Sequence, residues 1–203
     1  MVAAVGAGVL VVVLVMVGFA VFGGVGFPEA KYRLRVSAEL VGGTFKLSAD
    51  LSDTAGRQIV EENRNRSNVR NPTAVVGSYA GQGEQNGSRL VVSGLYGRFR
   101  SPAEARDDMS EGAAEAEGAT VAVPAHDVTV RGSDMTVRCQ VLTSEQGGTV
   151  SNVPMCVWGD DNTGASVGVI TDENVSQDPE DVDLEKLARM TLQVREEMRE
   201  PIG

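Results

Sequence analysis

The sequence predicts an α+β fold in which an N-terminal transmembrane helix precedes a mixed, mainly antiparallel sheet packed with about three helices. Three observations predict it. Residues 2–27 contain no charged side chain, whereas all 28 acidic and 18 basic side chains lie in residues 29–203. Several stretches of the second part alternate polar and apolar residues, which is typical of half-buried strands. Other stretches repeat apolar residues every three or four positions, which is typical of helices.

The apolar stretch at residues 2–27 predicts a membrane span. At 1.5 Å per residue, a helix of this length reaches ~39 Å, which exceeds the ~30 Å of hydrocarbon in a bilayer. A buried core helix would show a polar face, and this stretch has none. A cleaved secretory signal would begin with a basic region, but Met1 leads directly into apolar sequence. We therefore expect an uncleaved anchor with a Gly-rich exit at residues 1–28 and an extracytoplasmic domain at residues 29–203.

Two signals oppose each other in setting the orientation of the domain. Lys31, Arg33 and Arg35 follow the stretch at once and favour a cytoplasmic domain by the positive-inside rule. A bulky acidic domain and a pair of cysteines favour export. We expect a single-pass protein of the cell membrane with its C-terminal domain outside the cytoplasm.

The charge of the domain bears on its partners. Its formal net charge of -10 would repel phosphate backbones and anionic lipid head groups. The sequence shows no cluster of basic residues with interleaved aromatic residues that would override this locally. Nucleic acid is therefore not expected as a partner.

Cys139 and Cys156 are predicted to form a disulfide. They are not arranged as a CxxC motif, and His126 is the only histidine, so the ligands for a zinc site are too few. We expect no metal and no cofactor. An even pair in an exported domain favours a disulfide, and the Gly-Gly turn at 147–148 would bring two antiparallel strands together. In the cytosol the same residues would be two buried thiols. Trp158 would pack on the same side of the sheet as Cys156.

The other elements are predicted from periodicity and from the residues that begin and end them. Ser101 and Pro102 are typical of a helix N-terminus, and Pro201 of a helix end. The expected order is a hairpin at 31–47, a helix at 48–66, a hairpin at 73–99 with a mobile loop at 81–87, a helix at 101–117, strand at 120–130, a three-stranded meander at 135–171 with a mobile loop at 144–152, and a helix at 183–200.

The order of strand, loop, strand and Pro-led helix occurs twice, at 73–117 and at 153–200. This recurrence raises the hypothesis of an internal ββα duplication. Both units would then lie in one sheet with their helices on one face, an α+β arrangement.

No residue pattern indicates a catalytic or calcium site. His126 and Asp127 would need a nucleophile beside them, and no GxSxG turn exists, so a strand-edge histidine is the simpler interpretation. Residues 160–164 (DDNTG) begin like a calcium loop. However, its sixth and twelfth positions are Ala165 and Thr171, where such a loop requires Gly and an acid. A hairpin turn is the simpler interpretation.

Six segments together resemble a group of uncharacterised membrane-anchored proteins of high-GC actinobacteria. The segments are DLSDTAG at 50–56, SGLYG at 93–97, TVAVPAHD at 120–127, TVRCQVLT at 136–143, PMCVW at 154–158 and the closing VREEMREPIG. The likeness covers most of residues 31–203. It implies a single span, an extracytoplasmic domain with this cysteine pair, and a Pro/Gln/Gly-rich cytoplasmic tail, which this chain lacks. We therefore expect a further segment upstream, but the resemblance implies no activity and no site residues.

These observations favour a non-catalytic binding or sensing module of the cell envelope. The membrane would hold it through residues 2–27, and its partner would be an unidentified envelope protein or ligand. The alternative is an envelope enzyme whose site residues form no recognisable motif. A deep pocket lined by acids with perturbed pKa values would favour the enzyme, and a shallow face or groove would favour the module.

Overall fold

The computed structural model describes residues 26–146 and 149–203. Most of the predicted span, residues 2–25, lies outside this part of the chain. Its last two residues, Gly26 and Phe27, belong to no helix. No helix within the described residues is both long and apolar enough to cross a bilayer.

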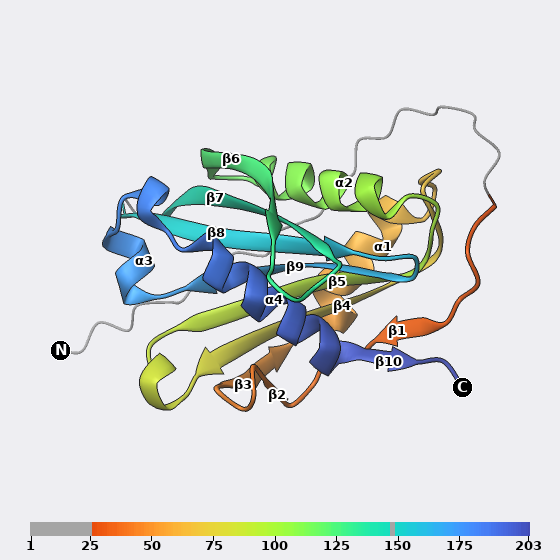
Figure 1. The fold of residues 1–203 in the computed structure, drawn as a ribbon, viewed down its shortest axis with the longest axis horizontal. Helices are drawn as coiled ribbons and strands as arrows, with labels where there is room; N and C mark the ends of the chain where they lie inside the picture. Colours follow the sequence, from red (N-terminus) through yellow and green to blue (C-terminus); the bar gives the residue numbers. More distant parts are fainter. Residues whose placement is uncertain (1–25, 147–148) are drawn as a thin grey trace.

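A single eight-stranded antiparallel sheet forms the centre of the molecule (Figure 1). In spatial order its strands are β2 (Glu39–Leu40), β3 (Phe45–Asp50), β4 (Val69–Gly81), β5 (Arg89–Phe99), β9 (Thr163–Ile170), β8 (Thr149–Gly159), β7 (Thr136–Gln146) and β6 (Ala119–Thr129). A separate pair joins β1 (Tyr32–Leu34) to β10 (Arg199–Pro201). The predicted α+β class is therefore confirmed. The sheet is antiparallel throughout the described strands, where a mixed sheet was expected.

Four α-helices accompany the sheet in the described chain. They are α1 (Arg57–Asn63), α2 (Pro102–Ala114), the short α3 (Asp172–Ser176) and α4 (Leu184–Met198). Single turns of other helix types lie at Ser52–Gly56, Gly83–Gln85 and Pro179–Asp181. The Ser101 and Pro102 signal is confirmed, because the Ser101 hydroxyl accepts a hydrogen bond from the Glu104 amide (3.2 Å) and Pro102 is the first helical residue.

The helices cover both faces of the sheet (Figure 1). Strand β8 shows the division, because its side chains alternate between two buried cores. Cys156 and Trp158 belong to the core that includes α4, whereas Met155 and Val157 belong to the core beneath α2. The sheet is thus the middle layer of three.

This layering corrects the hypothesis of an internal duplication. The hairpins β4–β5 and β9–β8 do lie side by side, through β5 and β9. If the two hairpins were repeats in this antiparallel sheet, a twofold rotation would exchange them about an axis perpendicular to the sheet. Such a rotation leaves every side chain and helix on the same face of the sheet. Helices α2 and α4 would then share a face, but they lie on opposite ones. The two units therefore do not form the repeat that was predicted.

Three predicted elements differ from the structure. Residues 31–40 do not form one strand, because β1 pairs with β10 at the other end of the chain and only β2 pairs with β3. Residues 48–50 belong to β3, where Ala49 and Asp50 pair with β4, so the helical stretch begins only at Ser52 and α1 at Arg57. Residues 144–146 and 149–152 form no loop, because they pair with each other as continuations of β7 and β8.

Candidate functional site

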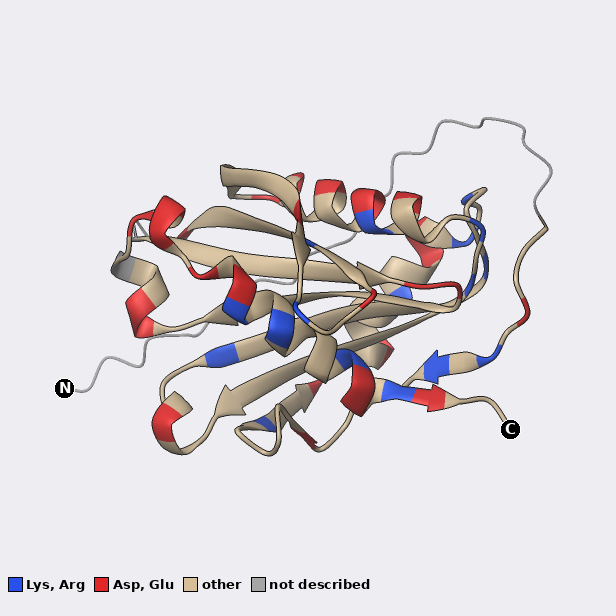
Figure 2. Cartoon of the chain, viewed as in Figure 1, with Lys and Arg blue, Asp and Glu red and all other residues tan. Residues whose placement is uncertain are grey.

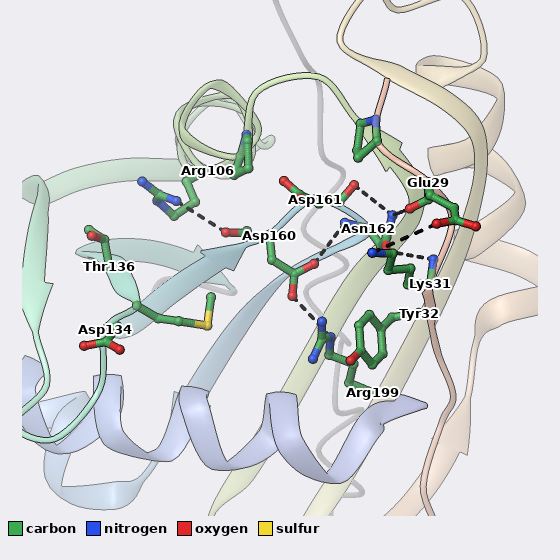
Figure 3. A pocket seen from close by; sticks show the side chains of 14 residues that line it. Glu29, Lys31, Tyr32, Arg106, Asp134, Thr136, Asp160, Asp161, Asn162 and Arg199 are labelled. Carbon is green, nitrogen blue, oxygen red and sulfur yellow. Dashed lines mark hydrogen bonds and ion pairs between the residues drawn. The ribbon is translucent and has the colours of Figure 1, made fainter. Parts of the chain in front are cut away.

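The sheet has one end at which the described chain begins, which we call the entry end. Here β4 begins, β5 and β8 end, and α4 leads into β10. A cleft of about 430 Å³ opens at this end (Figure 3). Its walls come from residues 28–32, the β8–β9 turn at 159–162, the start of α2, the β6–β7 loop at 134–136, and Arg199.

Asp160 lines the cleft and bonds to both the β8–β9 turn and the last helix. One oxygen, Oδ1, accepts hydrogen bonds from the backbone amides of Asn162 (3.0 Å) and Thr163 (2.8 Å), which shapes the hairpin turn. The other oxygen, Oδ2, accepts from Nη2 of Arg195 (2.8 Å) and lies 3.3 Å from Nε of Arg199. The hairpin turn predicted for residues 160–164 is confirmed. The buried pairing of Asp160 with the last helix is new.

The electrostatics of Asp160 follow from this pairing. Burial by itself would raise the pKa of the carboxyl group, but the Asn162 amide and the Arg195 guanidinium hold the pKa below its usual range. The side chains of Asp160 and Arg195 are only 17% and 10% exposed. Asp160 is therefore a fixed carboxylate that holds the turn to α4, and it is not positioned to exchange protons near neutral pH.

Asn162 joins the entry segment to the cleft. Its Oδ1 accepts a hydrogen bond from the Lys31 amide (2.9 Å), and its Nδ2 donates to the Glu29 carbonyl (2.8 Å). The same Nδ2 lies 3.3 Å from the carbonyl oxygen of Gly97 on β5. Asn162 is 2% exposed. One buried amide side chain thus binds residues 29–31 to the central sheet.

The remaining cleft walls combine an aromatic ring with charges of both signs. The Arg199 guanidinium lies over the Tyr32 ring, 3.2 Å from its centre. On the opposite wall, Nη1 of Arg106 donates to the Gly159 carbonyl (3.3 Å), while its buried Nε has no hydrogen-bond partner among the described residues. Asp134 also lines the cleft. The cleft therefore offers both donors and acceptors to a polar ligand.

Gly159 is what allows α2 to come so close to the turn. A Cβ atom at this position would lie 2.9 Å from the Pro102 carbonyl oxygen and 3.1 Å from Cγ of Arg106. The first contact is shorter than a Cβ atom tolerates and the second is tight, so a side chain at this position would force the helix or the Arg106 side chain to shift. Pro102, Arg106 and Gly159 all line the cleft, so this close contact is part of its wall.

Among the described carboxyl groups, only Asp108 on α2 has a pKa raised toward neutrality, and it lies outside the cleft. Burial, assisted by the negative charge of Glu104, raises the pKa of Asp108 on α2 to about 6, against the opposing effect of Arg66. Asp108 is 6% exposed and does not line the cleft. The structure thus separates this titratable group from the candidate binding site.

Cys139 and Cys156 form a disulfide in the structure, with their Sγ atoms 2.01 Å apart. They are direct register partners on β7 and β8, and both are fully buried beneath the start of α4. Trp158 is buried in the same core. The predicted turn residues 147–148 lie outside the described chain.

The other sequence candidates lie apart from the cleft. His126 is exposed on the edge strand β6, where its Nδ1 lies 3.1 Å from the Pro124 carbonyl oxygen, so the strand-edge interpretation is confirmed. Asp127 pairs with Arg138 at 3.3 Å. Neither residue lines the cleft.

A group of arginines that the sequence analysis did not identify lies at the entry end. Arg70 and Arg100 lie over the Phe27 ring, at 5.1 and 4.8 Å from its centre, and Arg98 is the direct register partner of Arg70. We call Arg70, Arg98 and Arg100 the arginine cluster. Figure 2 shows blue segments gathered on the loops at this end, whereas red segments follow α2 and α3. Arg98 and Arg100 are close in sequence, but sequence reasoning could not show that Arg70 on β4 and Phe27 lie beside them.

The comparisons with known proteins do not assign a family. The chain matches no protein-family model, and no curated protein or solved structure shows significant similarity to it.

Proposed function

We propose that the protein is a single-pass membrane protein whose extracytoplasmic domain is a non-catalytic binding or sensing module of the cell envelope. In this proposal residues 2–27 anchor the chain, and the cleft at the entry end takes a polar ligand. The observation that supports the proposal is which residues form one wall of the cleft. Residues 28–32, which follow the apolar stretch directly, form that wall.

The attachment of this wall supports a sensing role. Asn162 binds the backbone of Glu29 and Lys31, and β1 continues the segment into its pairing with β10. A ligand in the cleft would therefore contact the same backbone that leads to the anchor. Such a ligand can favour one arrangement of the anchor relative to the domain, provided that it binds the two arrangements with different affinity.

The buried disulfide supports a location outside the cytoplasm. Disulfides persist in oxidising compartments and are rare in the cytosol. Cys139 and Cys156 lie on adjacent strands under α4, so the bond belongs to the core of the fold and not to a reactive surface.

The character of the cleft favours a module over the alternative of an envelope enzyme. A general acid or base works best with a pKa near the working pH. The carboxylate on the cleft floor, Asp160, has a lowered pKa and is paired with two arginines, while Asp108, whose pKa is raised, lies outside the cleft.

Topology is tested with two reporters fused in turn after Gly203, one active only in the cytoplasm and one active only outside it. We expect a signal from the second alone. A signal from the cytoplasmic reporter alone would overturn the proposed location.

Ligand binding in the cleft is tested by site-specific photo-crosslinking in living cells. A photoreactive residue replaces Thr136, which lines the cleft, or Thr143, which lies further along the same strand and is also half-buried. We expect a discrete adduct from position 136 and none from position 143. Adducts of equal yield at both positions, or none at either, would contradict a ligand site in the cleft.

A further inference from the structure

We infer that the arginine cluster is a docking surface for the phosphate groups of anionic phospholipids in the bilayer that holds the chain. This inference rests on the proposed membrane anchor. It assigns an interaction surface that is distinct from the cleft.

The geometry of the chain places the cluster beside the bilayer. The apolar stretch ends at Phe27, and Arg70 and Arg100 lie over the ring of that residue. Phe27 is two residue steps from residue 25, and a fully extended chain covers only about 7 Å in two steps. If residues 2–25 lie in the membrane, the guanidinium groups must therefore lie at the depth of the lipid head groups.

The described chain supplies no carboxylate counter-ion to the arginine cluster. Within the described chain, no ion pair joins a carboxylate to Arg70, Arg98 or Arg100. Arg70 and Arg98 are nevertheless direct cross-strand partners, an arrangement in which like charges destabilise a sheet. Arg70 and Arg100 are exposed, and Arg98 is half-buried. Three adjacent cations without carboxylate partners fit an anionic partner from outside the chain.

Arginine is suited to such a partner. Its planar guanidinium donates two parallel hydrogen bonds to a phosphate group, and its positive charge persists at any physiological pH. Aromatic contact with Phe27 restrains two of the three side chains and so reduces the entropy lost on binding.

The acidic balance of the domain does not cancel this local attraction. Charges in solvent are screened over about 8 Å at physiological ionic strength. At the entry end, Glu29 has Lys31 at 4.0 Å as its own partner. Asp161 lies beside the cluster, because its carbonyl oxygen accepts a hydrogen bond from the Phe99 amide (2.8 Å), but within the described chain it forms no ion pair with Arg98 or Arg100. In this inference, the repulsion of anionic head groups that the net charge predicts is reversed locally at this end.

The test uses the full chain in detergent, mixed with equal amounts of phosphatidylglycerol and phosphatidylcholine, with retained lipid counted by native mass spectrometry. The test variant carries Arg70→Gln, Arg98→Gln and Arg100→Gln. A control variant carries Lys46→Gln, Arg89→Gln and Lys186→Gln, which remove the same charge from the opposite end of the sheet.

We expect the wild type and the control variant to retain phosphatidylglycerol in preference to phosphatidylcholine. The test variant should lose this preference by roughly fivefold for each arginine removed. A variant with lysine at the same three positions should keep most of the preference, because it keeps the charge. If the triple glutamine variant does not fold, the lipid preference of the single variant Arg100→Gln is compared with that of the wild type and the lysine variant.

Three outcomes would overturn the inference. They are a wild type without preference, a preference that survives in the glutamine variant, and displacement of the lipid by an equal concentration of inorganic phosphate. The second outcome would place the lipid on the apolar stretch, and the third would make the cluster a site for free phosphate. The reporter fusions measure topology independently, so a failure here is distinguishable from a failure of the proposed location.

Discussion

Replacing Asp160 by Asn should destabilise the domain far more than its position in a turn suggests. The amide oxygen of Asn can still accept the two backbone hydrogen bonds that shape the turn. However, the side chain loses its charge and faces Arg195 with an NH2 group. Because Arg195 is 10% exposed, its guanidinium would remain buried without its main counter-ion.

The expected magnitude follows from the burial of the pair. Removing one partner of a buried ion pair costs about 3–5 kcal/mol, since the remaining charge stays desolvated. For a domain of this size, this loss corresponds to a drop in melting temperature of roughly 6–20 °C. Arg195 also contacts the exposed Glu196, which places the expectation at the lower end of this range.

The assay is thermal unfolding of the full chain in detergent, followed by circular dichroism, with Asp161→Asn as the matched control. Asp161 is the exposed neighbour and forms no ion pair within the described chain, so its variant should melt within a few degrees of the wild type. Adding Arg195→Met to Asp160→Asn should restore part of the loss, because it removes the stranded charge. Equal melting temperatures for Asp160→Asn and Asp161→Asn would refute the reasoning.

The same variant has a defined pH dependence. Because the folded state lowers the pKa of Asp160, its contribution to stability is present above the ordinary pKa of an aspartate and is lost as the pH falls through the lowered value. The difference in stability between the wild type and Asp160→Asn should therefore shrink in acid. A difference that grows toward low pH would contradict this assignment.

Three further predictions concern other parts of the domain. Reducing the disulfide between Cys139 and Cys156 should cost ~3 kcal/mol of unfolding free energy, and native thiol titration should find no free thiol; two thiols per chain would refute the bond. Asp108→Asn should stabilise the domain at pH 7 by up to ~3 kcal/mol, since its folded pKa of about 6 lies about two units above the usual value. That gain should vanish in urea titrations below about pH 4, where both states hold the proton. Gly159→Ala should cost about 1–3 kcal/mol by overpacking against α2, whereas Gly168→Ala, with no contact under 3.7 Å, should be nearly neutral in the same titrations.

The elements that the sequence predicted well depend on local interactions. The Ser101 hydroxyl caps α2 through an amide three residues away, and Asp183 caps α4 through the Lys186 amide (2.8 Å). Such capping can be recognised within one turn of the chain. The hairpin β4–β5 was also visible, because each strand carries a long run of β-branched and aromatic residues.

The elements that the sequence did not predict depend on contacts between distant segments. Nothing near Tyr32 indicates that its strand pairs with the last residues of the chain. The face that each helix covers depends on the path of the connecting loops, which periodicity does not specify. For this reason α2 and α4 could be predicted as helices while their placement on one face was wrong.

The candidate site was missed for the same reason. Asp160 was recognised as a turn residue from its neighbours, but its pairing with Arg195 joins a hairpin to a helix far along the chain. The one local signal was the position of Arg195 on the last helix, where it falls on the same face as the buried apolar residues. A buried arginine requires a buried acid, so its partner could have been sought among the predicted turns.

Two of the basic residues that follow the apolar stretch, Arg33 and Arg35, form ion pairs within the fold, which the positive-inside rule does not consider. Arg33 and Arg35 both contact Glu200, at 3.2 and 2.8 Å, across the pairing of β1 with β10. They therefore stabilise the closure of the chain ends, and their presence does not require a cytoplasmic domain. Because Glu200 follows every strand of the eight-stranded sheet in sequence, the entry segment can complete this pairing only after those strands have been made. The cleft wall formed by residues 28–32 thus depends on strand β10, so this wall is completed only when the two segments have paired.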